Sequence, residues 1–175
     1  GCSGLTSITI PAGVTSIEDG TFYGCSGLTS ITIPDGVTSI GMDAFYICRG
    51  LASITIPDAV TSIGVEAFAG CSSLTSITIP DGVTSIEDST FYGCSRLTSI
   101  TIPDAVTSIG ADAFSYCTSL ASVYCKPTTP PTFGGNVFYN NATNRKIYTP
   151  TASVDAYKAA EGWSDYADAI VGYDF

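Results

Sequence analysis

The chain has 175 residues, 45% of them hydrophobic, which is enough to bury a continuous core within a single domain. Its formal net charge of −10 argues against nucleic acid and anionic membranes as partners, because both require clustered basic residues. The sequence contains no histidine, so the Ser–His and Cys–His arrangements of hydrolases cannot form within it.

One unit of 23 residues is repeated through the first two-thirds of the sequence. The first copy, residues 1–23, reads GCSGLTSITIPAGVTSIEDGTFY. The same frame restarts at Gly24, Ile47, Gly70, Gly93 and Tyr116. A fixed period of this length is typical of a solenoid, in which each unit forms one coil that stacks on its neighbours.

Each unit predicts two short strands and a turn. Ile8 and Ile10 alternate with Ser7 and Thr9, as in a half-buried strand, and a proline then ends the strand. Residues 14–17 predict a second extended piece. Residues 41–46 lack alternation and predict a single helical or 3₁₀ turn. The positions expected to line the core in the first copy are Cys2, Leu5, Ile8, Ile10, Val14, Ile17 and Phe22.

Two glycine positions vary among the copies. The turn glycine Gly36 is replaced by alanine in two other copies, and the position of Gly41 is occupied by Glu18 and Glu87 elsewhere. We therefore interpret both glycines as permissive and not as required by the backbone.

The repeat fades toward the C-terminus. Phe133 and Phe138 still occupy the positions of Ile17 and Phe22, and Asn141 takes the place of the repeated cysteine. We predict one domain over residues 1–175. Its parts are six repeats over 1–138, and a degenerate seventh repeat plus a C-terminal cap over 139–175.

The cap is expected to contain a helix of about residues 154–161, with Ser153 as its N-cap and Gly162 as its stop. The side chains expected to cover the end of the core are Trp163, Tyr166, Ile170 and Phe175. The alternative is an aromatic ligand site around Tyr157, Trp163 and Tyr166.

The pattern C-x-x-L-x-x-I-x-I-P-x-x-V-x-x-I-x-x-x-x-F resembles the BspA-like leucine-rich repeats of bacterial surface proteins. The resemblance covers about residues 1–125 closely, and the tail is similar to the cap of such domains. It implies a right-handed, β-rich leucine-rich repeat solenoid with short helical turns, on exported proteins often linked to adhesion. An extracellular or cell-surface location is expected on this ground alone, since the sequence shows no signal peptide. The resemblance carries no catalytic residue.

Six of the seven cysteines recur at one repeat position: Cys2, Cys25, Cys48, Cys71, Cys94 and Cys117. This slot holds an inward Asn or Cys in leucine-rich repeats generally, so a column of buried small side chains is favoured over disulfides. A zinc site is disfavoured, because there is no C-x-x-C pair and no histidine. No metal or other cofactor is expected.

An acidic ladder follows the first strand of successive copies, at about 4.8 Å per step. Its members are Asp35, Asp58, Asp81 and Asp104. Turn-favouring, solvated aspartates are the simplest interpretation. The alternatives are weak calcium binding and glycoside hydrolysis by paired carboxylates, for which a uniform exposed ladder offers no protonated partner. We expect no enzymatic activity.

The outward positions of the first strand form two hydroxyl columns that end in tyrosines. The candidate contact face comprises Ser30, Thr32, Ser53, Thr55, Ser76, Thr78, Ser99, Thr101, Tyr124 and Tyr148. Such a lattice can engage protein or glycan through many weak contacts, or it can be inert, since Thr is a good strand former. The two hypotheses for function are therefore a non-catalytic binding or adhesion module and a structural spacer with no tight ligand.

Overall fold

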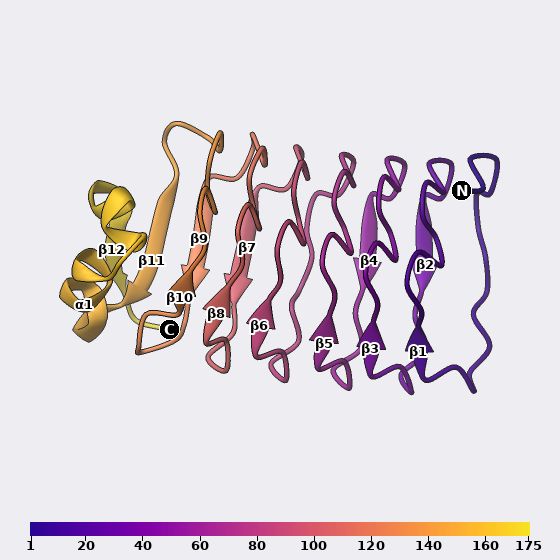
Figure 1. The fold of residues 1–175 in the computed structure, drawn as a ribbon, viewed down its shortest axis with the longest axis horizontal. Helices are drawn as coiled ribbons and strands as arrows, with labels where there is room; N and C mark the ends of the chain where they lie inside the picture. The colour runs from indigo at the N-terminus through magenta and orange to yellow at the C-terminus, as the bar shows by residue number, and fades with distance from the viewer.

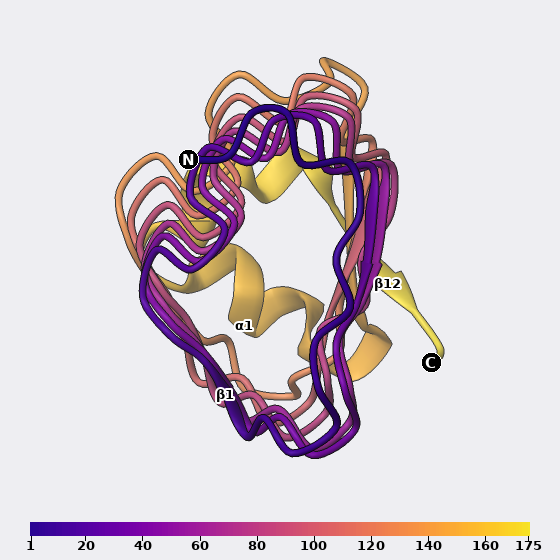
Figure 2. The ribbon, with the colours of Figure 1, turned by 90° about the vertical axis from the view of Figure 1, so that its right-hand side faces the viewer.

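The computed structural model describes all of residues 1–175, which wind into a rod of stacked coils (Figure 1). Two columns of short strands run along the rod. The first column consists of β2 (Ser30–Thr32), β4 (Ser53–Thr55), β7 (Ser99–Ile102), β9 (Ser122–Cys125) and β11 (Lys146–Pro150). The second column consists of β1 (Ser16–Ile17), β3 (Ser39–Ile40), β5 (Ser62–Ile63), β6 (Ser85–Ile86), β8 (Ser108–Ile109) and β10 (Thr132–Phe133). Seen along the rod, the two columns lie on different sides of a ring (Figure 2).

The strands of each column are parallel and pair in the register of the repeat. Ser30 pairs with Ser53, and Ser39 pairs with Ser62, so paired residues are 23 positions apart. In the first and fourth coils the first strand is reduced to a single bridge, such as the one between Ser53 and Ser76. The predicted stacking of 23-residue coils is confirmed, whereas the handedness of the rod stays a prediction.

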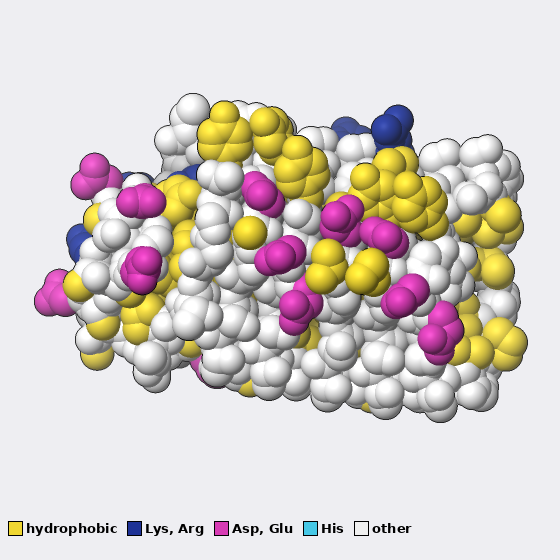
Figure 3. Space-filling view, in the orientation of Figure 1, with side chains coloured by type: hydrophobic (Ala, Val, Ile, Leu, Met, Phe, Trp, Pro, Cys, Tyr) yellow, Lys and Arg dark blue, Asp and Glu magenta, His cyan; other side chains and the backbone are white.

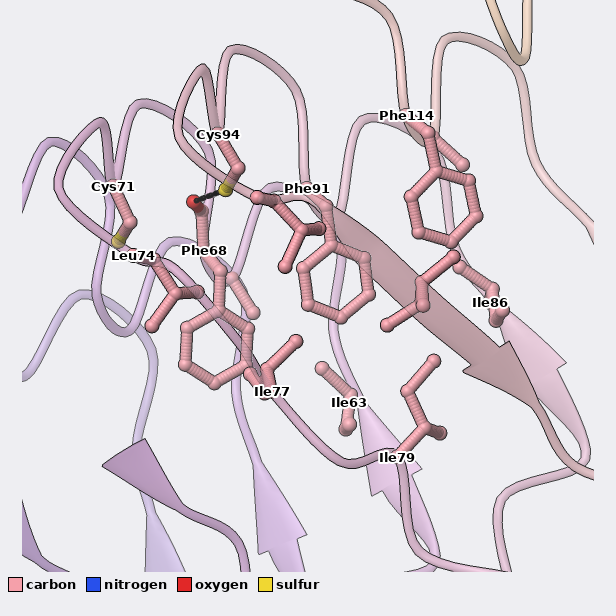
Figure 4. Packing of buried hydrophobic residues seen from close by; sticks show 14 of the residues in the cluster. Ile63, Phe68, Cys71, Leu74, Ile77, Ile79, Ile86, Phe91, Cys94 and Phe114 are labelled. Atoms are coloured by element: carbon pink, nitrogen blue, oxygen red, sulfur yellow. Dashed lines mark hydrogen bonds between the residues drawn. The ribbon is translucent and has the colours of Figure 1, made fainter. Parts of the chain in front are cut away.

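The predicted inward side chains form the core. A single cluster of 43 buried residues includes the repeated Cys, Leu, Ile, Val and Phe positions of the interior coils. Phe68, Phe91 and Phe114 stack nearly parallel, with ring centroids 5.7 and 5.3 Å apart (Figure 4). The first coil departs from the prediction, because nothing covers its outer side: Ile8 is 40% exposed and Cys2 is also exposed.

Residues 41–46 contain a single i→i+3 turn, in which Tyr46 N donates to the carbonyl of Asp43 at 3.0 Å, and they form no longer helix. They form a series of turns whose alternate N–H groups bond to the next coil, as Phe45 N does to the carbonyl of Ala67 at 2.8 Å. Asp43 and Ile47 have positive φ angles of 55° and 56°, which interrupt any helical run. A third ladder between coils therefore replaces hydrogen bonds within a helix.

The glycine interpretation is correct at Gly36 and wrong at Gly41. A Cβ at Gly36 would meet its neighbours at no less than 3.7 Å. A Cβ at Gly41 would lie 2.6 Å from the backbone nitrogen of Asp19 and still closer to its Oδ1. The Gly41 N–H also donates to the carbonyl of Ile17 at 2.7 Å. Gly41 is therefore required because two coils approach closely there.

The close approach of two coils also has a visible effect in the fourth coil, which lacks this glycine. Glu87 occupies the equivalent position, and it makes no backbone hydrogen bond to Ile63 like the one Gly41 makes to Ile17. The second column is split at this point into two sheets, one ending at β5 and the other at β6.

Replacing Gly41 with alanine is expected to destabilise the protein by about 1–3 kcal/mol, because the new methyl group would separate two coils. The matched variant Gly36→Ala should be neutral or more stable by about 0.4–1 kcal/mol, since it restricts only the unfolded chain. Urea unfolding followed by circular dichroism measures both. Equal free energies of unfolding for the two variants would contradict the close-approach explanation.

The C-terminal cap contains 3₁₀-helix η1 (Thr151–Ser153), helix α1 (Val154–Ala159), 3₁₀-helix η2 (Trp163–Ala169) and strand β12 (Ile170–Tyr173). Tyr157, Trp163 and Ile170 are buried against the last coil, so the predicted cap is confirmed. The alternative of an aromatic ligand site is wrong, because Tyr157 and Trp163 are inaccessible to solvent. None of the short helices has the length or hydrophobicity to span a lipid bilayer.

Three details of the cap differ from the prediction. The helix ends at Ala159, and the Ser153 hydroxyl makes no capping bond, because it donates instead to the carbonyl of Thr128 at 2.7 Å. Residues 170–173 add a further parallel strand beside β11, with Ile147 paired to Ile170. Phe175 does not cover the core, because this strand carries it to the outer surface, where it is 52% exposed.

Candidate binding face

The predicted hydroxyl columns point outward from the first strand column. Alternation along each strand buries Ile31 and Ile54 and leaves their serine and threonine neighbours outside. Seven of these side chains are exposed: Ser30, Thr32, Ser53, Thr55, Ser76, Thr78 and Ser99. Thr101, Tyr124 and Tyr148 are half-buried on the same side. We call this surface the strand face.

The acidic ladder lies at one edge of the strand face. Asp35, Asp58, Asp81 and Asp104 are all exposed, in the turns that follow the first strands. No group of three potential metal-ligating side chains converges anywhere on the molecule. Of the four aspartates, Asp104 alone lines the depression described below. Further acidic side chains are spread along the different face shown in Figure 3.

The cysteine column lies inside the rod and has a hydrogen-bonding role that the sequence analysis missed. The thiol of Cys94 donates to the carbonyl of Phe68, 26 residues earlier, at 3.3 Å (Figure 4). Cys48, Cys71 and Cys117 make the same bond. Asn141 replaces the thiol in the last coil, where its amide donates to Phe114 at 2.8 Å. An amide or a thiol suits this slot because a carbonyl from an earlier coil requires a donor.

These thiols are poor nucleophiles. Burial raises the pKa of Cys48 to about 11 and that of Cys117 to about 12, and it also raises the pKa values of Cys71 and Cys94. The predicted burial of the column is thereby confirmed for the interior coils.

An aromatic corner, formed by Tyr124, Tyr148, Tyr173 and Phe175, ends the strand face near the cap. Tyr124 on β9 and Tyr148 on β11 stack face to face, with centroids 4.8 Å apart and planes inclined by 13°. Tyr173 on β12 meets both rings edge-on, at 5.6 Å from each. Phe175 lies edge-on to Tyr173 at 5.0 Å. The corner exists because three successive strands carry a tyrosine on their outward side.

A depression of about 570 Å³ opens beside this corner. Its lining residues are Thr101, Asp104, Tyr124, Lys126, Tyr173 and Phe175. The strand face therefore offers one place where a ligand meets ring surface, a carboxylate, an ammonium group and hydroxyls together. Tyr124 and Thr101 were predicted as contact residues and Asp104 as a ladder residue, and the structure brings the three together.

The sequence analysis missed Tyr173 and Phe175 as surface residues. The β-branched and aromatic residues Ile170, Val171 and Tyr173 are the available signal, but four residues outside the repeat frame are too few to predict which side of a strand faces outward.

A second series of aromatic side chains, which was not predicted either, lies at the junctions between successive copies of the repeat, away from the strand face. Tyr23 and Tyr46 stack there at 4.9 Å, and Tyr116 lies 5.3 Å from Tyr92 and 5.5 Å from Tyr139.

Parallel two-column coils with a repeated inward Leu-Ile-Val-Phe set define a leucine-rich repeat solenoid. The BspA type leucine rich repeat region matches this chain in six copies, over residues 1–121 and 38–159. The chain therefore belongs to the BspA-type leucine-rich repeat family, whose domains are protein-interaction or structural repeat modules. No curated protein matches the sequence.

Several solved structures are similar. A leucine-rich repeat protein of T. pallidum is 24% identical with a TM-score of 0.67, and the match covers 96% of this chain and 85% of that one. One from Bacteroides ovatus is 26% identical, with a TM-score of 0.63 and coverage of 99% and 61%. A protein of Faecalibacterium prausnitzii described as a leucine rich cell surface protein is 34% identical, with a TM-score of 0.61 and coverage of 83% and 48%. The chain thus spans less than two-thirds of the last two proteins.

Proposed function

We propose that this chain is a non-catalytic binding module of an exported bacterial surface protein, which contacts protein or glycan through its strand face. The location is supported by the family and by the F. prausnitzii relative, described as a cell surface protein. The proposed partners do not include nucleic acid, because the net charge of −10 repels it. The proposal involves no insertion into a membrane.

The observation that carries the proposal is the depression at the aromatic corner. Aromatic rings are enriched at recognition surfaces because they bury much area at low entropic cost. Tyr173 and Phe175 are 43% and 52% exposed although both are large and apolar.

The second candidate function is a structural spacer. It is favoured by the uniformity of the exposed Ser and Thr columns in the first four coils, which present no distinct site. The two functions differ in whether the isolated chain has measurable affinity for any partner.

An array of glycans and extracellular proteins, probed with the whole chain, tests the proposal. The face variant Thr78→Lys/Ser99→Lys should bind at least about tenfold more weakly, because two long cations would obstruct the strand face. The control variant Thr15→Lys/Thr84→Lys adds the same charge at exposed sites just before β1 and β6, and it should bind normally. Absence of signal at micromolar concentration would favour the spacer.

A further inference from the structure

We infer that the aromatic corner binds one uncharged pyranose ring of a glycan, which stacks on the open face of Tyr124 above Thr101. This inference rests on the proposed binding role of the strand face and names the chemistry of its ligand.

The strand register leaves one face of Tyr124 uncovered. Tyr124 pairs with Tyr148 on one side and with Thr101 on the other. Tyr148 covers the first face of the ring by stacking, and Tyr173 approaches the ring edge-on at 70°. The depression is lined by Thr101 and Tyr124 but not by Tyr148, so it lies on the second face.

The space above Thr101 leaves room for a flat ring beside Tyr124. Successive strands are about 4.8 Å apart. The Tyr124–Tyr148 stack has a centroid spacing of 4.8 Å, which shows that this spacing accommodates a flat ring at each step. Threonine is much smaller than tyrosine, so the position next in the column is empty above its side chain. A flat group of one ring's thickness would continue the stack.

The polar groups around the gap favour a sugar over an aromatic side chain. Thr101 forms the floor, and Asp104 and Lys126 line the same depression. A pyranose presents C–H bonds on its faces and hydroxyl groups around its edge. Its faces therefore suit Tyr124, while its edge can pair with the hydroxyl, carboxylate and ammonium groups. The edge of a phenylalanine side chain has no such partners, so its entry would leave these polar groups desolvated without compensation.

The charges in the depression favour an uncharged ring. Asp104 and Lys126 carry opposite charges and line one small site, so neither an anionic nor a cationic ligand gains from its net field. Each charged group can instead form a charge-assisted hydrogen bond with a hydroxyl group.

Thr101→Tyr tests the inference directly, because the new ring would fill the gap and extend the tyrosine stack. The fold should tolerate it, since tyrosine already occupies this column at 124 and 148. Titrations of the whole chain with cellohexaose, maltohexaose and chitohexaose, followed by NMR of the tyrosine ring signals, supply the affinities. We expect millimolar or tighter binding of at least one hexaose, a loss of at least about tenfold in Thr101→Tyr, and no loss in Thr84→Tyr, the same change at an exposed threonine outside the strand face.

Two further variants separate stacking from hydrogen bonding. Tyr124→Ala should lose at least about tenfold in affinity, and the conservative Tyr124→Phe, which retains the ring, should recover most of that loss. A phenylalanine-containing peptide, titrated in parallel, represents the competing aromatic ligand.

The outcomes distinguish the inference from the function on which it rests. If no hexaose binds at millimolar concentration, or if Thr101→Tyr binds it normally, the inference is overturned. Array binding that depends on Thr78 and Ser99 would then still support the strand face as a binding surface. Binding of the phenylalanine peptide in the gap, without any hexaose, overturns the inference in favour of a protein partner. No binding in either experiment overturns both.

Discussion

The free energy of unfolding is expected to fall steeply as pH rises above about 8.5, the ordinary pKa of a thiol in an unfolded chain. Five buried thiols cause this fall: Cys48, Cys71, Cys94, Cys117 and Cys125. Burial raises the pKa of each by desolvating the thiolate, to about 11 for Cys48 and about 12 for Cys125.

The direction of this change in stability follows from the number of thiol protons that the folded and the unfolded states hold. Above pH 8.5 the unfolded chain releases the thiol protons, whereas the folded chain keeps them, so unfolding becomes more favourable. The stability contributed by each thiol is complete below pH 8.5 and is lost by the time pH exceeds its folded pKa. The loss is about 1.4 kcal/mol per thiol per pH unit, which gives about 7 kcal/mol for five thiols at pH 9.5.

Urea unfolding at pH 7.5 and 9.5, with a phosphine reductant present, measures this loss. The variant Cys71→Ala/Cys94→Ala should show a smaller pH dependence, by about 2.8 kcal/mol between pH 7.5 and 9.5, whatever its stability at pH 7.5. Maleimide applied to the folded protein should label the exposed Cys2 much faster than these five thiols. Equal free energies at the two pH values would refute the buried-thiol column.

Replacing Trp163 with alanine is expected to cost about 3–5 kcal/mol, because a fully buried indole would leave a cavity between the cap and the last coil. The ring packs 4.5 Å from Phe133 and meets Tyr157 edge-on at 4.8 Å, measured between centroids. Its Nε1–H donates to the carbonyl of Pro131 at 2.8 Å. The indole therefore joins the cap to the loop of the sixth coil through packing and through a hydrogen bond.

Trp163→Phe separates the two contributions. It retains a ring but leaves the Pro131 carbonyl without its donor, at a cost of about 1–3 kcal/mol. Ser164→Ala, at the exposed neighbouring position, is the control and should change the stability by less than about 0.5 kcal/mol. Thermal and urea unfolding give the values. A cost below about 1 kcal/mol for the alanine variant would mean that the cap does not stabilise the rod.

The repeat made most of the fold predictable. Because each coil stacks on a nearly identical coil, the period of 23 residues fixes the strand register as well as the local pattern. The alternation of Ile31 with Ser30 and Thr32 therefore predicted both the inward side and the hydroxyl columns correctly. Asn141 was also placed correctly in the cysteine slot, since its amide reaches the carbonyl of Phe114.

The errors fall where a contact is not visible in the pattern of one coil. Gly41 appeared replaceable because other copies carry Glu, but its requirement comes from the backbone of Asp19 in the coil before it. Residues 41–46 lacked strand alternation, and they form the one predicted turn between Asp43 and Tyr46, yet their alternate N–H groups bond to the next coil. Phe175 was predicted to cover the core, because nothing in its sequence neighbourhood indicates that β12 carries it to the outer surface.

The candidate site was only partly predictable. Tyr124 and Tyr148 stood out as departures from the hydroxyl columns, and the register correctly placed them side by side. Their grouping with Tyr173 depends on how the cap turns back to add a strand, and the cap occurs once in the chain, without a second copy to phase it.

The amino-acid sequence by itself determined the coil, its period, the side chains that face inward and the family. Because each coil packs against a near copy of itself, the local pattern also determines which residues meet between coils. The tertiary structure alone decided which coils approach too closely for a Cβ, where the cap ends, and that Tyr124, Tyr173, Asp104 and Lys126 share one depression. These features arise from contacts between segments that follow different patterns, and the physics of such contacts depends on distances that no single segment encodes.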